Sequence, residues 1–215
     1  MTITYPRDML LCTQWQGPEF VLEYAYTRAL AGGGLPQVAE VAPALWVGKW
    51  RTTQMGRDNI SNWRAWLRSL RGGLRTFKAV PPFYRWPRLH PRGFAGMLYS
   101  GSPWTGTGNL SNIAALRDQV TVNAIPNGLV MAPGDYVSIV VGARQHLHQV
   151  IEGGTSSGNL VTLTVEPTIR PGAVTGVTVL FEYPYCEMAL RGTPNEPQDN
   201  RILGQFSFDG VQVAR

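Results

Sequence analysis

The second half of the chain most constrains the fold, because one pattern recurs along it. Between Gln119 and Tyr183, short runs rich in Val, Ile, Leu and Thr alternate with turns rich in Gly, Pro, Asn and Ser. The runs read QVTVNAI, YVSIVV, HLHQVIE, LVTLTVE and VTVLFEY, and the turns include PNG, APGDY, GGTSSG and RPGAVTG. Short strands at this spacing are typical of a small antiparallel barrel or sandwich. We therefore predict a small β domain here.

The first eighty residues carry the signals of a different unit. The segment Glu19–Leu30 (EFVLEYAYTRAL) predicts a strand, and VAEVAPALWVGKWRTT predicts a second one after a turn of three glycines. Pro43 in the second segment favours an edge or a bulge, since proline cannot donate to the ladder. Leu74–Val80 predicts a third strand. The closing GQFSFDGVQVA alternates Phe206 and Phe208 with polar residues, and we expect it to return to the first sheet.

These patterns predict a mainly β protein with one flanking α-helix. Residues 1–82 and 181–215 are expected to form a discontinuous β domain. Residues 83–180 are expected to form a loop and an inserted small β-barrel or sandwich domain. The stretch Pro81–Asn112 reads as loop because it is dense in Pro, Gly and Ser.

The segment Asn59–Val80 (NISNWRAWLRSLRGGLRTFKAV) contains the one long helical pattern. We expect a helix from about Gly56 to Arg71, with Asp58 in its first turn and glycines after its end. At about 100° per residue, five apolar side chains share one arc and should pack on the sheet. This core stripe consists of Ile60, Trp63, Trp66, Leu67 and Leu70. A flanking arc collects four arginines, which we call the arginine ridge: Arg57, Arg64, Arg68 and Arg71.

The arginine ridge fits carboxylates of a neighbouring subunit, open solvent, a membrane surface or nucleic-acid phosphates. We favour the neighbouring subunit, because the helix is short and tethered between two strands. The net charge of +5 permits an acidic partner or nucleic acid. We expect charge reversal of Arg64 and Arg68 to block assembly and to leave the monomer folded.

Enzyme motifs are missing from the sequence. It contains no G-x-S-x-G, no G-x-x-x-x-G-K-[ST] and no H-E-x-x-H. The stretch GTGNLSN starts like a glycine-rich phosphate loop, but a Pro-rich segment precedes it instead of a strand. Acid pairs such as Glu182 with Glu187, or Glu152 with Glu166, have no spacing that places them around a substrate. We therefore expect a protein that is not an enzyme, without catalytic residues or a cofactor.

His146 and His148 are the sharpest candidates for ligand chemistry. Residues two apart share a face of a strand, so two imidazoles could bind a metal if a third ligand such as His90 approached. The alternative is a solvated or hydrogen-bonded pair, and we favour it because no spacing places a third ligand. We predict no metal site. The run FYRWPRLHPR could stack nucleic-acid bases, but its prolines favour a packed loop whose aromatic side chains fill a subunit junction.

Composition points to assembly. Charged residues make up 15%, against about 25% in ordinary globular proteins. Few charges and many turns favour burial between subunits. Cys12 and Cys186 are expected to be reduced structural thiols, since disulfide scaffolds carry more cysteines. No basic segment precedes an apolar run at the N-terminus, and no window of about 18 residues is apolar. We therefore expect neither a signal peptide nor a membrane span.

Several stretches, spread over most of the chain, suggest a family. They are WRAWLRSLRGGLRTF, GLVMAPGDYVSIVVG, HLHQVIEGG, VTLTVEPTIRPG, EYPYCEMALRG and GQFSFDGVQVA. Together they resemble the distal tail proteins, or minor tail proteins, of long-tailed bacteriophages and related prophages. The resemblance implies a tail-tube-like β domain whose copies close into a ring, typically a hexamer. Such a ring joins the tail tube to the baseplate hub.

The implied partners are other copies of the chain, the tail tube protein and the tail hub protein. A tail fibre or a surface glycan is a further implied partner of the inserted barrel. DNA would pass through the ring without specific binding. The implied location is the virion tail tip, after synthesis in the bacterial cytoplasm. Two alternatives stay open: a carbohydrate- or receptor-binding module that uses the barrel and the loop Phe94–Asn112, and a cell-wall-degrading enzyme.

Overall fold

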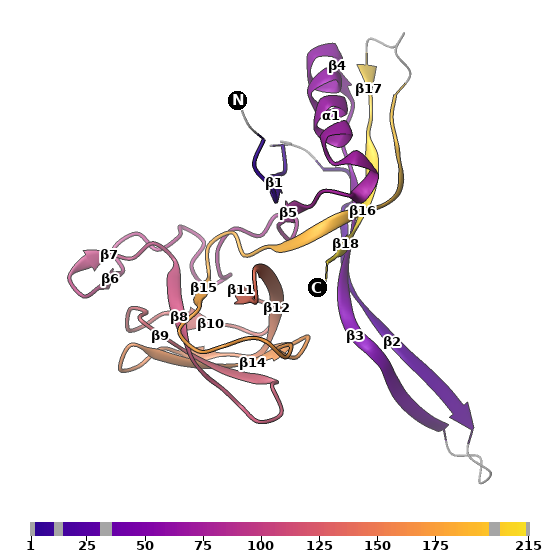
Figure 1. Cartoon of the computed structure of the whole chain (residues 1–215). Coiled ribbons are helices and arrows are strands. Elements are labelled where there is room, and N and C mark those ends of the chain that lie inside the picture. Colours follow the sequence, from indigo (N-terminus) through magenta and orange to yellow (C-terminus); the bar gives the residue numbers. More distant parts are fainter. Residues whose placement is uncertain (1–2, 11–14, 31–35, 198–202, 214–215) are drawn as a thin grey trace. The chain divides into compact units, whose positions relative to one another are not determined.

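The protein folds into two compact units (Figure 1). The computed structural model describes all of the 215 residues except 1–2, 11–14, 31–35, 198–202 and 214–215. Unit 1 comprises Met1–Phe77 and Met188–Arg215, and unit 2 comprises Lys78–Glu187. Strands predominate, and the part of the chain that the structure describes has one α-helix, so the mainly β prediction is confirmed. None of the helical segments described is both long and apolar enough to span a membrane.

Unit 1 is built on a six-stranded sheet with the order β1-β5-β16-β18-β3-β2. Its last strand, β18, pairs with β16 on one side and with β3 on the other, so the C-terminal strand returns to the first sheet as expected. Strand β16 was not predicted. Two short strands, β4 (Met55–Gly56) and β17 (Leu203–Gly204), pair separately. The strands of the main sheet are β1 (Arg7–Asp8), β2 (Glu19–Leu30), β3 (Pro36–Arg51), β5 (Phe77–Ala79), β16 (Cys186–Asn195) and β18 (Ser207–Gln212).

The helix α1 (Arg57–Ser69) packs on this sheet through its apolar stripe. The ring of Trp66 lies 5.4 Å from that of Phe77 on β5 and 5.6 Å from that of Phe208 on β18. The indole N–H of Trp66 also donates to the Asp8 carbonyl at 2.8 Å. All five stripe residues are at most 5% exposed: Ile60, Trp63, Trp66, Leu67 and Leu70.

The helix ends in a turn that glycine makes possible. A short 3₁₀ turn, η1 (Arg71–Gly73), follows α1. Gly72 and Gly73 have φ angles of 63° and 99°, which glycine adopts without steric cost. The chain then enters β5, which is shorter than the strand predicted over Leu74–Val80.

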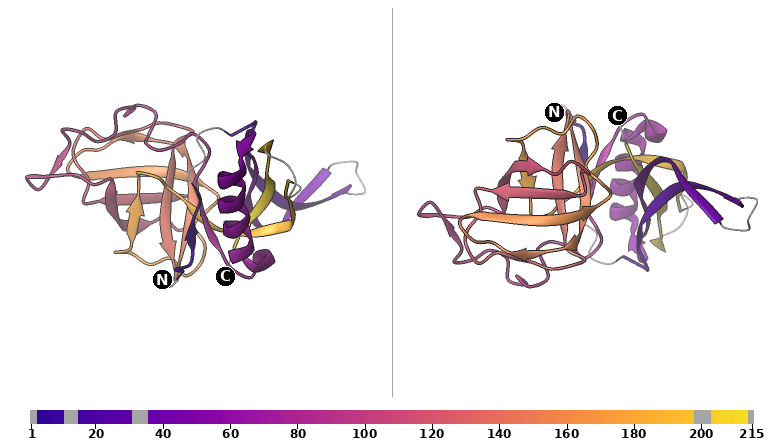
Figure 2. Two further views of the ribbon diagram at one scale, coloured as in Figure 1. Left: turned by 90° about the horizontal axis from the view of Figure 1, so that it is seen from above. Right: turned by 90° about the horizontal axis from the view of Figure 1, so that it is seen from below.

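Unit 2 contains a closed barrel, and the barrel prediction is confirmed. The two views of Figure 2 show its strands wrapping around one interior. Two short pairs flank it: β6 (Leu98–Tyr99) with β7 (Ser102–Pro103), and β10 (Val130–Met131) with β13 (Gly154–Thr155). In the order in which they neighbour one another, the barrel strands are β11 (Tyr136–Val141), β12 (Arg144–Glu152), β14 (Leu160–Glu166), β9 (Gln119–Asn123), β8 (Thr107–Ile113) and β15 (Thr178–Leu180).

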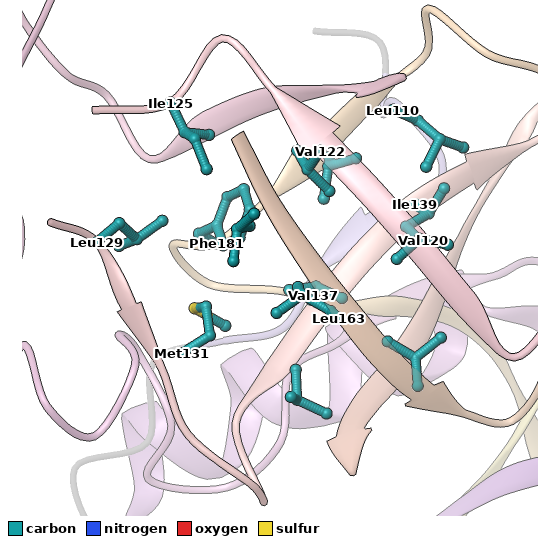
Figure 3. Packing of buried hydrophobic residues seen from close by; sticks show 14 of the residues in the cluster. Leu110, Val120, Val122, Ile125, Leu129, Met131, Val137, Ile139, Leu163 and Phe181 are labelled. Carbon is teal, nitrogen blue, oxygen red and sulfur yellow. The ribbon is translucent and has the colours of Figure 1, made fainter. Parts of the chain in front are cut away.

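Apolar side chains fill the barrel (Figure 3). The fully buried residues come from different strands, including Leu110, Val122, Ile139 and Leu163. Because side chains of a strand alternate between two faces, each strand sends every second residue into this core. The barrel closes its own strand edges, which removes them as pairing sites.

Strand β8 corrects the prediction that Pro81–Asn112 is loop throughout. Residues of β8 alternate between exposed and buried positions, with Gly108 and Leu110 facing inward. A Cβ on Gly108 would lie 2.8 Å from side-chain atoms of Ile125 and Val122, so this inward position requires glycine. The outward positions hold Thr, Asn and Ser. The amino-acid composition of β8 therefore resembles that of a loop, although the segment is a barrel strand.

Candidate functional site: an exposed hairpin arm

The longest strands of unit 1 extend beyond the rest of its sheet. Strands β2 and β3 pair from Glu19↔Lys49 to Leu30↔Pro36. Strand β18 pairs with β3 only over residues 47–51. The far part of β2 and β3 is therefore a two-stranded ribbon, visible as the projecting pair of strands in Figure 1. We call residues 23–30 and 36–45 the hairpin arm. Pro43 lies within a β-bulge of β3, as its sequence position predicted.

One face of the arm continues the core of unit 1. Even-numbered residues of β2 share a face, because side chains alternate along a strand. On this face Phe20 stacks on the buried Trp46 with ring centroids 5.2 Å apart. Farther along the same row, beyond Leu22, Tyr24 and Tyr26 are 55% and 51% exposed. An apolar row that starts in the core thus runs onto an uncovered ribbon.

The partner strand adds apolar surface to the arm. Val38 lies opposite Arg28 and is 61% exposed, and Val41 is 70% exposed. The guanidinium of Arg28 lies 4.9 Å from the ring centre of Tyr26, so a cation–π contact holds this ring in place. The arm therefore presents a pre-arranged aromatic and aliphatic surface. Large apolar side chains that cluster on an exposed surface mark interaction sites.

Sequence reasoning found both strands of the arm but missed that they leave the sheet. The apolar residues Tyr24, Tyr26, Val38 and Val41 are of the kind that an ordinary half-buried strand also contains. Exposure here depends on where β18 stops pairing with β3, and that register is a tertiary property. The one signal available in the sequence is length, since the strand β3 covers 16 residues.

The arginine ridge of α1 divides into two parts. The Nε atom of Arg64 lies 3.2 Å from a carboxylate oxygen of Glu196, and its Nη2 donates to the Pro197 carbonyl at 2.9 Å. Arg64 therefore binds its own chain, which corrects the expectation that it is available to a neighbour. Arg57, Arg68 and Arg71 are exposed, and no side-chain hydrogen bond or ion pair joins them to the rest of the described chain.

Arg64 ties a C-terminal segment to the start of α1. Pro197 packs closely against Gly204, where a Cβ would lie 2.4 Å from the proline ring and 3.0 Å from Ile60. Leu203 and Gly204 form β17, which pairs with β4 immediately before the helix. The contacts of Glu196, Pro197 and β17 are therefore made with the stretch between β4 and the middle of α1.

His146 and His148 point into the barrel. His146 lies opposite Ile139, and His148 lies opposite Val137. Directly opposed residues of antiparallel strands share a face, and both partners belong to the apolar core. The two imidazoles are only 3% and 0% exposed, so the pair is not solvated. The hydrogen-bonded alternative holds for His148, whose Nδ1 lies 2.6 Å from the carbonyl oxygen of Pro167.

No third ligand joins the histidine pair in the described part of the chain. His90 is engaged elsewhere, because its Nε2 accepts the Val130 N–H at 3.0 Å. No group of three or more His, Cys, Asp or Glu side chains in the described residues could hold a metal ion. The fields of Arg170 and Arg144 also act on the pair, and positive charge disfavours a bound cation.

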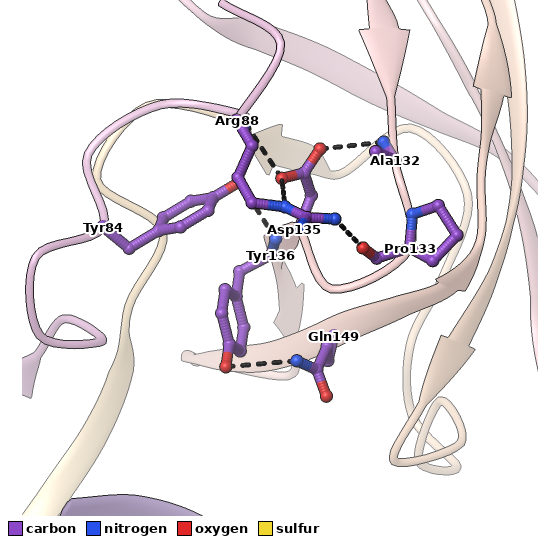
Figure 4. Close-up of polar contacts among 7 residues, drawn as sticks. All are labelled: Tyr84, Arg88, Ala132, Pro133, Asp135, Tyr136 and Gln149. Carbon is purple, nitrogen blue, oxygen red and sulfur yellow. Dashed lines mark hydrogen bonds and ion pairs between the residues drawn. The ribbon is translucent and has the colours of Figure 1, made fainter. Parts of the chain in front are cut away.

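The aromatic and basic run FYRWPRLHPR is a packed loop (Figure 4). The buried carboxylate of Asp135 accepts the backbone N–H of Arg88 at 3.0 Å and that of Ala132 at 2.8 Å. The hydroxyl of Tyr84 accepts the Tyr136 N–H at 3.0 Å, and burial raises the pKa of Tyr84. These contacts attach the run to the barrel of its own unit, so the run is a packed loop, and its role in a subunit junction stays a prediction.

Glu182 and Glu187, one of the acidic pairs noted in the sequence, each form an ion pair with a different arginine. Glu182 binds Arg85 at 3.2 Å, and Glu187 binds Arg144 at 2.6 Å. Each carboxylate therefore serves its own arginine. Cys186 is a buried free thiol whose pKa is raised, first by burial, whereas Cys12 lies outside the described residues.

The arm, the exposed ridge arginines and the histidine pair are the features that any account of function has to explain. Two of them, the arm and the ridge, belong to unit 1, and the histidines belong to unit 2. Compared with known proteins, the chain matches no family model and no curated sequence.

Proposed function

We propose that this protein is a structural subunit of a bacteriophage tail tip. Copies of the chain assemble into a ring, typically a hexamer, which joins the tail tube to the baseplate hub. The phage setting rests on the sequence resemblance to distal tail proteins. The observation that carries self-assembly is the hairpin arm, whose apolar face continues the core of unit 1 onto an uncovered ribbon.

The hairpin arm leaves large side chains exposed to water on a two-stranded ribbon. A two-stranded ribbon is marginally stable by itself in water. Full burial of a side chain the size of Val or Leu gains about 1.5–3 kcal/mol. Tyr24, Tyr26, Val38 and Val41 are all about half exposed or more, so covering them supplies a substantial driving force. A neighbouring subunit is the cover that a ring provides for every copy.

The geometry of the arm favours a ring over a two-fold dimer. Strand β2 is the edge strand of the sheet, and the arm extends that edge. If the arm packs on a different surface of the next copy, the contact is head-to-tail, and such contacts form a ring when the rotation between copies closes and an open filament when it does not. Ring closure also covers open strand edges, which otherwise promote aggregation. Unit 1, with its sheet and single helix, is the ring-forming, tail-tube-like domain in this proposal.

The exposed part of the arginine ridge fits the same assembly. Arg57 and Arg68 on α1, and Arg71 just after it, have no side-chain partner among the described residues, and we place them against carboxylates of a neighbouring subunit. A basic lumen would hold the phosphates of passing DNA, which favours the subunit interface over the lumen. The tail tube protein and the tail hub protein are the proposed partners above and below the ring.

The test removes the apolar surface of the arm without touching the core. Tyr26→Ser combined with Val38→Ser should convert assembled protein to monomer, with an unchanged thermal unfolding midpoint. The matched control is Leu116→Ser in unit 2, since Leu116 is 81% exposed and lies in a turn of the barrel. Light scattering after gel filtration measures the mass, and negative-stain images show whether particles are rings.

Two results would overturn the proposal. One is assembly of the arm variant at the yield of the unchanged protein. The other is a chain that stays monomeric over a wide concentration range and also fails to bind purified tail tubes. Ring particles lost only in the arm variant support the proposal.

A further inference from the structure

Two histidines interrupt the apolar lining of the barrel on a single strand. His146 and His148 lie on the inward face of β12, opposite the core residues Ile139 and Val137 of β11. Both rings are almost fully buried. An imidazole in such a place is stable while it is neutral, because a charged group loses its hydration when it is buried.

The hydrogen bonding of His148 leaves no place for a second proton. Its Nδ1 lies 2.6 Å from the carbonyl oxygen of Pro167. A carbonyl only accepts, so Nδ1 carries the ring proton and donates it. The Nε2 atom is buried and has no hydrogen-bond partner among the described residues. A proton added at Nε2 would create a buried cation whose new N–H has no acceptor.

The charges around the pair are positive. Arg170 acts on both rings, and Arg144 acts on His146. The carboxylate of Glu187 is engaged with Arg144 at 2.6 Å. On β14, Glu166 lies opposite Gln149, which places it on the outward face of the barrel wall. Strand β11 contributes Val137 and Ile139 on the inward face, and neither is charged.

We propose that His146 and His148 form an acid-sensitive latch, which holds the barrel of unit 2 closed while both imidazoles are neutral and lets it open when they take up protons. The positions of the histidines explain why acid should open unit 2 and leave unit 1 folded. All three histidines of the chain, His90 included, lie in unit 2, and unit 1 has none. Acid therefore places buried positive charge in unit 2, whereas unit 1 has no histidine that could take up a proton.

The direction of the pH effect follows from the neutral ground state. Burial lowers the pKa of both rings from 6.5 to about 4. The unfolded chain therefore binds protons before the folded barrel does. The stability from the neutral pair is fully present above pH 6.5 and is lost as the pH falls through 4. By linkage, each imidazole lowers the folding constant of the barrel about 60-fold between pH 7 and about pH 4.5, and the pair together lowers it roughly 3000-fold.

The experiment follows the two units separately in the full-length chain. The protein is held at a series of pH values, labelled by a deuterium pulse at one fixed pH, and analysed by peptide mass spectrometry. Peptides from β11 and β12 should lose protection between pH 6.5 and 4. Peptides from β3, α1 and β18 should keep it. Loss of protection in both units at the same pH would overturn the proposal.

Two further measurements decide the role of the histidines. His146→Gln with His148→Gln has neutral side chains at every pH and should stay protected in acid, whereas the control His90→Gln should open like the unchanged protein. If the double variant does not fold, the histidine ring resonances of the unchanged protein give the answer. Two of the three should titrate in the folded state with apparent pKa values near 4. Titration of all three near 6.5 without loss of protection would refute the latch.

Discussion

Replacing Arg64 by alanine should destabilise unit 1 by about 2–3 kcal/mol, whereas replacing Arg68 should not. Arg64 loses an ion pair with Glu196 at 3.2 Å and a hydrogen bond to the Pro197 carbonyl at 2.9 Å. A largely exposed ion pair contributes about 0.2–1 kcal/mol. This pair is more sheltered, with side chains 18% and 31% exposed, so we take about 1 kcal/mol. A hydrogen bond from a charged donor adds about 1.5 kcal/mol.

Arg68 is the matched control for this experiment. It lies one helical turn from Arg64 on the same ridge and is exposed. Substitutions at exposed positions without partners usually change the free energy of unfolding by less than about 0.5 kcal/mol. Urea unfolding followed by far-UV circular dichroism gives both values, with the m-value as a check that the transition is the same. A double-mutant cycle of Arg64→Ala and Glu196→Ala should give a coupling energy of about 1 kcal/mol.

The outcome decides what the ridge does. Equal, small losses for both arginines would show that the contacts with Glu196 and Pro197 do not stabilise unit 1. With the predicted difference, charge reversal at Arg64 is a poor test of assembly, since it disrupts the fold as well. Arg68→Glu with Arg71→Glu is then the proper test. It should prevent ring assembly and leave the unfolding midpoint of the monomer unchanged.

Two further changes test the packing of the units. Asp135→Ala removes the acceptor of two backbone N–H groups inside unit 2, so it should cost about 3–5 kcal/mol in urea unfolding, against less than about 0.5 kcal/mol for the exposed control Glu152→Ala. A loss under about 1 kcal/mol at Asp135 would contradict this assignment. Gly48→Ala places a methyl carbon 2.1 Å from the Trp50 ring and should lower the unfolding free energy of unit 1 by about 2–3 kcal/mol. The control Gly56→Ala meets nothing within 4 Å, and equal losses at both glycines would refute the packing argument.

The periodic segments were predictable because the order of apolar and polar residues in each one gives its burial pattern. Strands β9, β11 and β14 occupy the runs that alternate, or are richest, in β-branched residues, and their bounds follow those runs closely. The stripe of α1 is equally local, since a period of 3.6 residues collects Trp63, Trp66 and Leu70 on one side of any helix formed there. These elements need only the backbone geometry and the polarity of each side chain.

Other features depend on partners that are distant in sequence. Strand β8 is rich in Gly, Ser and Asn, and only closure of the barrel shows why Gly108 must be glycine. Arg64 binds Glu196, which is 132 residues away in the sequence. The helical wheel therefore gives the side of the helix on which Arg64 lies, but it cannot identify the partner. For the histidines, a period of two shows that His146 and His148 share a face and does not say which face is inside.

The sequence by itself therefore determined the mainly β class, the recurring barrel strands, the single helix and the stripe by which it packs. These follow from local alternation and periodicity, which each segment carries whatever surrounds it. Only the tertiary structure decided that the histidines face inward, that Arg64 binds its own chain and that the arm of β2 and β3 extends uncovered. Each of these depends on strand register and barrel closure, which arise when segments far apart in sequence pair with one another.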